Sequence, residues 1–297
     1  MDNREEVREF LTSRRAKISP EQAGLPAGSR RRVPGLRRSE VASLADMSVE
    51  YYAKLERGNL TGVSPAVLEA VARVLQLDDA ERAHLLNLAH AADGTDALTR
   101  PRPRRARGHP QVHRSLRWTL DAITAGPAVV CNGRLDILAS NRLADAFYAD
   151  LYANPVNERN LARFQFLDPS SRRFYPDWDL FADMAVAMLH AQAGRNPYDR
   201  DLHDLVGELS TRVEEFRTRW GAHNVRRHGT GTKRFHHPAV GGLTLAYESL
   251  DLAADPGLHM TVYTAEPGSP SEEGLRLLAS LAATEGSTPL ATEHTTG

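Results

Sequence analysis

The chain has 297 residues, of which 41% are hydrophobic and 25% charged, so it is long enough for two folded domains and too apolar for a disordered protein. Its first residues, MDNREEVREF, are charged where a signal peptide needs an apolar core, and no apolar run approaches the roughly 18 residues of a membrane span. A single cysteine, Cys131, excludes an internal disulfide and a zinc site of several cysteines. We therefore expect a cytoplasmic protein without a metal or another resident cofactor.

The net charge of −1 conceals a difference between the two parts of the chain. Residues 1–108 carry 19 Lys and Arg against 15 Asp and Glu, a net charge of +4. The residues after them carry 18 against 23, a net charge of −5. A basic front part followed by an acidic back part indicates that only the front part meets a polyanion.

Five short helices are predicted in residues 1–92. Their expected positions are 4–14, Ser39 to about Ala45, Ser48 to Arg57, a helix opened by Ser64-Pro65, and a helix opened by Asp78 with Glu81. Serine and aspartate at these starts can accept hydrogen bonds from the first free N–H groups of a helix, and Gly58 is a suitable stop for the third helix. The segment 15–36 is rich in Pro, Gly and Arg and is expected to form a loop or short turns.

The second and third helices meet in the stretch RRSEVASLADMSVEYYAKLERG at 37–58. Its apolar residues are spaced to form a seam between two helices, and they are Val41, Ala42, Ala45, Met47, Tyr52 and Leu55. This is the spacing of a helix-turn-helix, in which one helix braces the DNA backbone and the second lies in the major groove. Val49, Glu50 and Lys54 then lie on the outer face of the second helix. Glu50 can accept from a cytosine amino group, and Lys54 can donate to guanine.

Basic side chains and helix ends beside this corner suit phosphate groups, because guanidinium groups and free helix N–H groups both bind anions. The residues expected to contact DNA are Arg30, Arg31, Arg32, Arg37, Arg38, Ser39, Ser48, Val49, Glu50, Tyr51 and Lys54. The alternative is an amphipathic helix pair in an ordinary bundle, which the caps, the corner and the stop in register disfavour.

The pattern x-E-V-A-x-L-A-x-x-S-V-x-x-Y-x-x-L-E-R-G at 39–58 resembles the phage-repressor type, or Xre-type, helix-turn-helix. One departure is Asp46, where many relatives have Gly in the turn. Asp tolerates the left-handed backbone conformation better than most residues. The resemblance implies an all-α DNA-binding domain of five helices.

A linker is predicted at 93–110, where the sequence DGTDALTRPRPRRARGHP loses the apolar period and gathers Pro, Gly and Arg. Two interpretations stay open for its arginines. They are either a solvated spacer or an additional contact to DNA phosphates.

After the linker the pattern changes to helices and strands. The expected elements are a helix at 112–123, a type I′ hairpin around Asn132-Gly133, a helix from Ser140 to about Tyr152, helices near 177–193 and 200–221, and strands at 233–238, 243–250 and 258–265. A hairpin, helices and three further strands describe one α+β domain around a five-stranded antiparallel sheet.

Chemical motifs are scarce in the back part. It contains no H-E-x-x-H, G-x-S-x-G or G-x-G-x-x-G motif. Among His223, His228, His236 and His237, the last two are adjacent on a predicted strand and therefore point to opposite faces, which disfavours a metal site. Cys131 is expected to be a small core residue rather than a sensor thiol.

Bulky apolar residues offer a pocket for an apolar ligand. The residues expected to line it are Trp178, Phe181, Met184, Met188, Phe216, Trp220, Leu243, Leu245, Tyr247, Met260 and Val262. The strand residues of this set are expected to share one concave sheet face with the tryptophans and Phe181. The alternative is that all these side chains simply fill the core.

Further motifs lie along the chain, namely G-L-R-R-S-E-V-A at 35–42, S-V-E-Y-Y-A-K-L-E-R-G at 48–58, L-V-G-E-L-S at 205–210, E-F-R-T-R-W at 215–220, H-P-A-V-G at 237–241 and Y-T-A-E-P-G-S at 263–269. Together they resemble the MmyB-like transcriptional regulators over about residues 4–280. Asn224 stands where relatives often have Asp. The resemblance implies a bacterial regulator whose PAS-like back domain binds a small ligand, with fatty-acid-like molecules as candidates.

We expect four segments: a helix-turn-helix DNA-binding domain at 1–92, a basic linker at 93–110, an α+β PAS-like ligand-binding domain at 111–270, and a C-terminal helix with a disordered tail at 271–297. The predicted protein is a dimeric regulator, not an enzyme, that reads a palindromic operator in double-stranded DNA and responds to a small apolar ligand, without membrane contact. In the alternative, the back domain binds a protein partner or only dimerises. A more distant alternative is an enzyme fused to a DNA-binding module.

Overall fold

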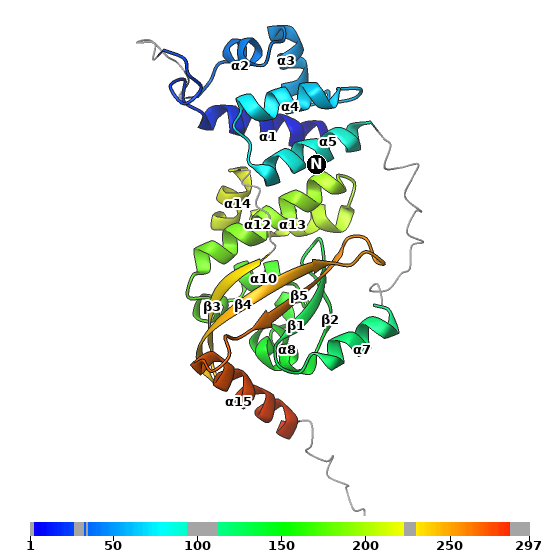
Figure 1. Cartoon of the computed structure of the whole chain (residues 1–297), viewed down its shortest axis with the longest axis vertical. Coiled ribbons are helices and arrows are strands. Elements are labelled where there is room, and N and C mark those ends of the chain that lie inside the picture. The colour runs from blue at the N-terminus through cyan, green and yellow to red at the C-terminus, as the bar shows by residue number, and fades with distance from the viewer. Residues whose placement is uncertain (1–2, 27–32, 34, 94–111, 223–229, 286–297) are drawn as a thin grey trace, which may run out of the picture. The chain divides into compact units, whose positions relative to one another are not determined.

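The computed structural model describes residues 3–26, 33, 35–93, 112–222 and 230–285 (Figure 1). The chain divides into two compact units, which we call the helical unit (1–106 and 183–227) and the sheet unit (107–182 and 228–297). The segment 183–227 therefore groups with the helical unit, whereas the sequence placed it in the ligand-binding domain. Most of the expected linker and the end of the expected tail lie outside the described residues. Over the described ranges, no helix combines the length and apolar character needed to cross a membrane.

The front of the helical unit contains the five helices that the sequence predicts. They are α1 (Asn3–Lys17), α2 (Arg38–Leu44), α3 (Val49–Glu56), α4 (Pro65–Val74) and α5 (Asp79–Ala92). The side chains of Ser48, Ser64 and Asp78 accept hydrogen bonds at the starts of α3, α4 and α5, as expected from the sequence.

The start of α2 differs from the expectation. Ser39 lies inside the helix, which begins at Arg38. The carboxylate of Glu40 accepts a hydrogen bond of 2.7 Å from the N–H of Arg37 and so holds this end instead. A glutamate three residues after the cap position can do this whether or not a serine stands beside it.

The predicted seam is the core of this part of the unit. Val41, Ala42, Tyr52 and Leu55 are buried together with apolar residues of α1. Gly58 ends the turn after α3 with a φ of +89°, and a Cβ atom here would lie 2.3 Å from the backbone oxygen of Arg4. The close approach of α1 to this turn therefore requires glycine.

The rest of the helical unit comes from the later segment. It comprises residues 183–195 of α12 (Trp178–Arg195), α13 (Arg200–Arg212) and α14 (Glu214–Gly221), and the first residues of α12 belong to the sheet unit. The single helix expected at 200–221 is interrupted at Val213, whose backbone is extended.

A buried polar contact holds this segment to α1. The Nδ1 atom of His190 lies 3.2 Å from Oε1 of Glu6, and its Nε2 atom lies 2.9 Å from the backbone oxygen of Trp220. The His190 ring also stacks on the indole of Trp220, with 3.7 Å between centroids. Both ring nitrogens thus face acceptors from different helices, which fixes α12 and α14 on α1.

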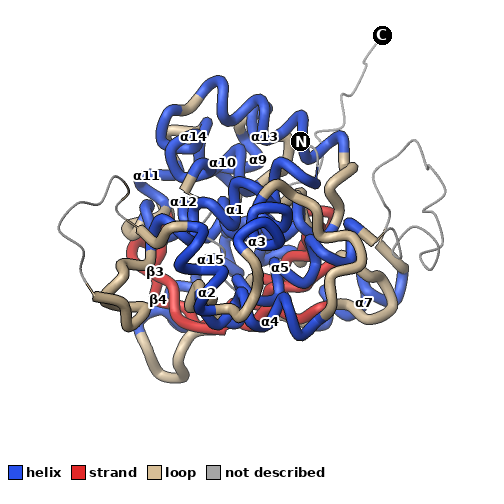
Figure 2. Tube along the Cα trace, turned by 90° about the horizontal axis from the view of Figure 1, so that it is seen from above, coloured by secondary structure: helices blue, strands red, loops and turns tan. Residues whose placement is uncertain are grey.

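The sheet unit contains the expected five-stranded antiparallel sheet. Its strands are β1 (Ala128–Asn132), β2 (Ile137–Ser140), β3 (Thr230–His237), β4 (Gly241–Asp251) and β5 (Leu258–Thr264), in the order β2-β1-β5-β4-β3. The edge strand β3 and its neighbour β4 run side by side at the left of Figure 2. The helices are α7 (Arg114–Ala122), α8 (Arg142–Phe147), α9 (Ala149–Ala153), the 3-10 helix η1 (Pro155–Asn157), α10 (Leu161–Leu167), α11 (Ser171–Phe174) and α15 (Pro270–Glu285).

Two local expectations in this unit are wrong. The turn between β1 and β2 is not a two-residue type I′ turn, because β2 begins only at Ile137 and the left-handed residue of the loop is Leu135. Ser140 does not cap the next helix; Asn141 does, with its side chain accepting from the N–H of Ala144 at 2.8 Å. The same asparagine binds the backbone of Gly126 and Ala128, and these longer-range contacts favour Asn141 over Ser140 as the capping residue.

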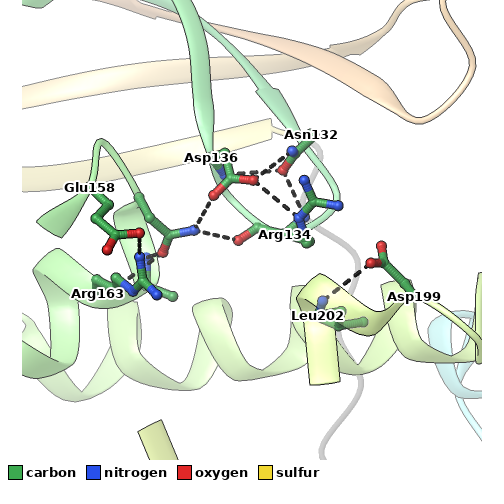
Figure 3. A network of polar contacts seen from close by, with 9 residues as sticks. Asn132, Arg134, Asp136, Glu158, Arg163, Asp199 and Leu202 are labelled. Atoms are coloured by element: carbon green, nitrogen blue, oxygen red, sulfur yellow. Dashed lines mark hydrogen bonds and ion pairs between the residues drawn. The ribbon is translucent and has the colours of Figure 1, made fainter. Parts of the chain in front are cut away.

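The side chain of Asp136 organises the loop between β1 and β2 (Figure 3). Its carboxylate accepts hydrogen bonds from the side chains of Asn132 at 2.7 Å, Asn160 at 2.8 Å and Arg134 at 3.1 Å. Desolvation alone would raise the pKa of this carboxyl, but the two asparagine hydrogen bonds and the charge of Arg134 outweigh it and lower the pKa. Asn160 also caps α10, so the network fixes that helix against the hairpin.

We predict that Asp136→Asn lowers the free energy of unfolding at pH 7 by about 1–3 kcal/mol. The asparagine amide is neutral and has a single acceptor oxygen, so it cannot accept all three hydrogen bonds that the carboxylate accepts. Since the pKa of Asp136 is lowered in the folded protein, its stabilisation is present above the ordinary Asp pKa and is lost as the pH falls through the lowered value. The difference between wild type and variant should therefore shrink between pH 7 and about pH 3.

Urea unfolding at both pH values measures this difference. Asp121→Asn, at an exposed position of α7, is the matched control and should change little. An equal loss for Asp136→Asn at pH 7 and pH 3 would show that the carboxylate charge has no part in the network.

Candidate functional site

The outer face of α3 is the exposed surface that the sequence predicts. Val49, Glu50 and Lys54 are exposed, with 40% of Val49 accessible. Tyr52 and Leu55 on the opposite face are buried. The helix is therefore held by one face and presents the other, which is the arrangement of a recognition helix that enters the major groove.

The corner before α3 has the geometry of the motif. Asp46 adopts the left-handed conformation with a φ of 53°, which Asp tolerates better than most residues other than glycine. The hydroxyl of Ser48 accepts a hydrogen bond of 3.1 Å from the N–H of Tyr51. Ser48 is exposed and Tyr51 half-buried, so the start of α3 stays accessible.

The structure describes only some of the residues that were expected to contact DNA phosphates. Arg37, Arg38 and Ser39 are exposed at the start of α2. The predicted contacts Arg30, Arg31 and Arg32 lie outside the described residues. Of these residues, Arg38 at the start of α2 contacts α3, through Glu56 at the end of that helix.

Sequence reasoning missed Glu56, whose side chain is 1% exposed and anchors the recognition helix. Its Oε1 accepts from Nε of Arg15 on α1 at 2.7 Å, and its Oε2 accepts from Nε of Arg38 on α2. The hydrogen bond to Glu56 raises the pKa of the Arg38 guanidinium. Arg38 is therefore engaged by Glu56 while its side chain stays half-exposed, which limits the free phosphate contact that the sequence assigned to it.

We predict that Glu56→Gln lowers the stability of the folded protein by about 3 kcal/mol, because it leaves two guanidinium groups beside a neutral amide in a buried position. Glu69→Gln is the matched control. Glu69 pairs with Arg82 at 3.3 Å on the surface, where removing a pair costs under about 1 kcal/mol. Thermal or urea unfolding of both variants measures the contrast, and equal losses would contradict an anchoring role for Glu56.

In the sheet unit, one sheet face carries most of the expected apolar strand residues. This inner face consists of Lys233, Phe235 and His237 of β3, Leu243, Leu245 and Tyr247 of β4, and Tyr263 of β5. Phe147, Phe174 and Phe181 from the covering helices place their rings 5.0 to 5.6 Å from the ring of Phe235. The face is thus a closely packed aromatic cluster.

The expectation that Met260 and Val262 share this face is wrong. Tyr247 pairs with Tyr263, whereas Val262 pairs with Glu248 and Met260 with Leu250. Directly paired residues point to the same side of a sheet, so Met260 and Val262 lie on the opposite face. There Met260 packs with β1 and with Leu120 of α7.

The helix residues that were expected to line the pocket lie in two different units. Trp178 and Phe181 belong to the sheet unit, whereas Met184, Met188, Phe216 and Trp220 belong to the helical unit. Trp178 contacts the guanidinium of Arg172 at 3.9 Å, and Phe181 stacks on Tyr175 at 4.0 Å. In the helical unit, Phe216 and Trp220 are buried and Met184 and Met188 half-buried.

A pocket of about 540 Å³ that sequence reasoning missed lies at the edge strand β2. It is lined by Arg117, Ile137, Leu138, Ala139, Ser140, Asp145, Tyr152 and Arg159. Arg159 has a left-handed backbone with a φ of 57°, and its guanidinium lies 4.8 Å from the ring of Tyr152. Its lining comes from α7, β2, α8, α9 and the turn at Arg159, and no local pattern could have indicated it.

The remaining candidates are Cys131 and the histidines. Cys131 is buried, and desolvation raises the pKa of its thiol to about 12, which makes it the unreactive core residue that was expected. His236 is exposed and His237 buried on β3, so they do point to opposite faces. His223 and His228 lie outside the described residues, and no metal-binding group of three or more His, Cys, Asp or Glu occurs within the described ranges.

Comparison with known proteins agrees with both parts of this arrangement. The model of the MmyB-like transcription regulator ligand binding domain matches residues 112–278, which is more than half of the chain. A helix-turn-helix domain model matches residues 11–85. A comparison with curated proteins found no match. The chain therefore belongs to the MmyB-like transcription regulators and combines a helix-turn-helix domain with a ligand-binding domain.

Proposed function

We propose that this DNA-binding transcription regulator acts in the cytoplasm as a dimer, reads a palindromic operator, and responds to a small apolar, fatty-acid-like ligand. The observation that carries the proposal is the division of α3 into a buried face and an exposed face that bears Glu50 and Lys54. Both matching family models are those of a regulator, so the proposal assigns no catalytic step.

Base readout is assigned to two exposed side chains one helical turn apart. Lys54 donates to guanine O6 or N7, and Glu50 accepts from a cytosine amino group. The exposed guanidinium of Arg37 at the start of α2 suits a phosphate, which positions the protein without reading the sequence.

We predict that Lys54→Ala loses about 1–3 kcal/mol of binding free energy on a specific operator and relaxes the preference at one base pair. Arg37→Ala is the control for a phosphate contact. It should weaken specific and random DNA alike and lower the slope of log affinity against log salt by about 1. Fluorescence anisotropy with both DNAs at several salt concentrations measures the difference. Equal losses on specific and random DNA for Lys54→Ala would contradict base readout.

Dimerisation is proposed because one helix-turn-helix covers too little DNA for the affinity that an operator requires. Two-fold dimers place their recognition helices about 34–36 Å apart, one turn of B-DNA. We predict a footprint over two inverted half-sites at that spacing, and loss of most of the affinity when 5 base pairs are inserted between them. A footprint over a single half-site by a protein that sedimentation shows to be monomeric would exclude this symmetry.

The ligand is proposed from the apolar, aromatic inner face of the sheet unit and from the match to a ligand-binding domain. The second candidate is a back domain that binds a protein partner or only dimerises. Native mass spectrometry of the purified protein separates the two. A co-purifying lipid or metabolite supports the sensor, whereas a consistently empty protein that binds a protein partner supports the second candidate.

A further inference from the structure

The pocket at the edge strand β2 is separate from the aromatic inner face of the sheet. None of the residues of that inner face lines it. Its volume of about 540 Å³ is in the range of sites that hold a small molecule. The proposed apolar ligand is assigned to the inner face, so the polar lining of this pocket has no role in binding it.

Two arginine side chains give the lining its positive charge. Arg117 comes from α7 and Arg159 from the turn before α10, and both are exposed. Within the described part of the chain, neither guanidinium forms an ion pair with a carboxylate. The one carboxylate of the lining, on Asp145, accepts a hydrogen bond from Oγ of Ser140. Two positive charges against one negative charge leave the lining with a net charge of +1.

The acidic side chains around this turn are engaged with other arginines (Figure 3). The carboxylate of Glu158, the residue directly before Arg159, pairs with Arg163. The carboxylate of Asp136 pairs with Arg134 at 3.1 Å. Both carboxylates thus bind neighbouring arginines, and the guanidinium of Arg159 stays available at the pocket.

The backbone of the turn is in an unfavourable conformation at this point. Glu158 and Arg159 are both left-handed, with φ angles of 46° and 57°, which residues with a Cβ atom rarely adopt. The N–H of Ile137 donates to the backbone oxygen of Arg159 at 2.8 Å. The buried side chain of Asn157 donates to the carboxylate of Asp168 at 2.8 Å and holds the start of the turn. Conformations of this kind persist where the surrounding contacts enforce them, and they concentrate at binding sites.

The ring of Tyr152 positions the guanidinium of Arg159 beside the pocket. The two groups lie 4.8 Å apart, measured from Cζ of Arg159 to the centre of the ring. A guanidinium can contact a ring with its face and still donate hydrogen bonds, because its N–H groups lie in its own plane. Arg159 is therefore held on one side and able to bind an acceptor on another.

Two guanidinium groups match a phosphoryl group better than a carboxylate. A phosphate monoester carries a charge of about −1.5 to −2 at pH 7 and has three acceptor oxygens, so it can accept from both arginines. A carboxylate has a single charge, and one guanidinium already binds both of its oxygens. A peptide strand added to β2 is disfavoured, because the N–H of Ile137 is already bound to the turn.

We propose that this pocket binds a small phosphate monoester, whose phosphoryl oxygens accept hydrogen bonds from the guanidinium groups of Arg117 and Arg159. The bound phosphoryl group joins α7 to the turn before α10 and so stabilises the sheet unit. This site is additional to the proposed site for an apolar ligand and differs from it in the chemistry of the ligand.

Calorimetry on the full-length protein at pH 7 tests the proposal with three probes of similar size, namely glycerol 3-phosphate, glycerate and glycerol. Wild type should bind glycerol 3-phosphate at least about tenfold more tightly than glycerate, because a second charged hydrogen-bonding group is engaged. Glycerol, which has no charge, should not bind measurably. Glycerate that binds as tightly as glycerol 3-phosphate would overturn the assignment of a phosphoryl group.

Three arginine variants locate the site. Arg117→Gln and Arg159→Gln should each lower the affinity for glycerol 3-phosphate at least about tenfold. Arg114→Gln is the matched control, since Arg114 is exposed on α7 and does not line the pocket. All three positions are exposed, so the variants are expected to fold, and thermal unfolding verifies this. Equal affinity in all three variants would place the anion elsewhere and overturn the proposal.

The carboxylate of Asp145 provides a test with the opposite sign. Asp145→Asn removes a negative charge from the lining and keeps an oxygen that can accept from Ser140. The variant should bind glycerol 3-phosphate about threefold more tightly than wild type, because a like charge is gone. Unchanged or weaker binding in this variant would contradict a phosphoryl group beside Asp145.

A further measurement uses wild-type protein alone. In ¹H–¹⁵N spectra, glycerol 3-phosphate should shift the backbone amide signals of Ser140 and Arg159, which line the pocket, and leave that of Leu245 on the inner face unchanged. It should also raise the midpoint of thermal unfolding as its concentration rises. Shifts at Leu245 without shifts at Ser140 and Arg159 would place the ligand on the inner face and overturn the proposal.

Discussion

The pairing of β4 with β5 decides which side chains of the sheet unit can act together. Tyr247 opposes Tyr263, and from this one register Leu243, Leu245 and Lys233 are placed with Tyr263 on the inner face. A shift by one residue would bring Val262 and Met260 to the inner face and send Tyr263 to the side of α7. The ammonium group of Lys233 lies beside the rings of Tyr247, Tyr263 and Phe181 only in the observed register, because the two tyrosines come from these two strands.

This register also explains what the sequence could not predict. In LHMTVYTA both parities of β5 contain bulky residues, with Met260 and Val262 on one and His259 and Tyr263 on the other, and every residue from Leu258 to Tyr263 is buried or half-buried. Alternation within β5 alone then does not indicate which of its side chains face inward. The pairing with the neighbouring strand determines this. The inward position of Lys233 was predictable from local sequence. In KRFHH it is two residues before the apolar Phe235, so both side chains point to the same face of the strand.

The helix-turn-helix was predictable because its signals are local. Ser48, Ser64 and Asp78 each accept from the N–H three residues later, and the apolar seam repeats at helical spacing. The wrong expectations arise where distant groups compete. Asn141 displaces Ser140 as a cap because it also binds backbone groups more than ten residues away. The packing of 183–227 with the helical unit likewise involves a distant contact, between His190 and Glu6, which are 184 residues apart.

Helix α1 connects more of the helical unit than its position at the start of the chain indicates. Arg15 pairs with Glu56 of α3, Arg14 with Glu81 of α5 at 2.6 Å, and Glu6 with His190 of α12, and the backbone at Arg4 closes on Gly58. Local opening of α1 would leave several buried charges without their partners at once, so small partial openings of this unit are costly. The unit should consequently exchange its core amide protons together rather than helix by helix. Its recognition helix is therefore already folded when it binds DNA. A segment that folds only on the DNA loses part of its binding free energy to ordering, and this helix does not.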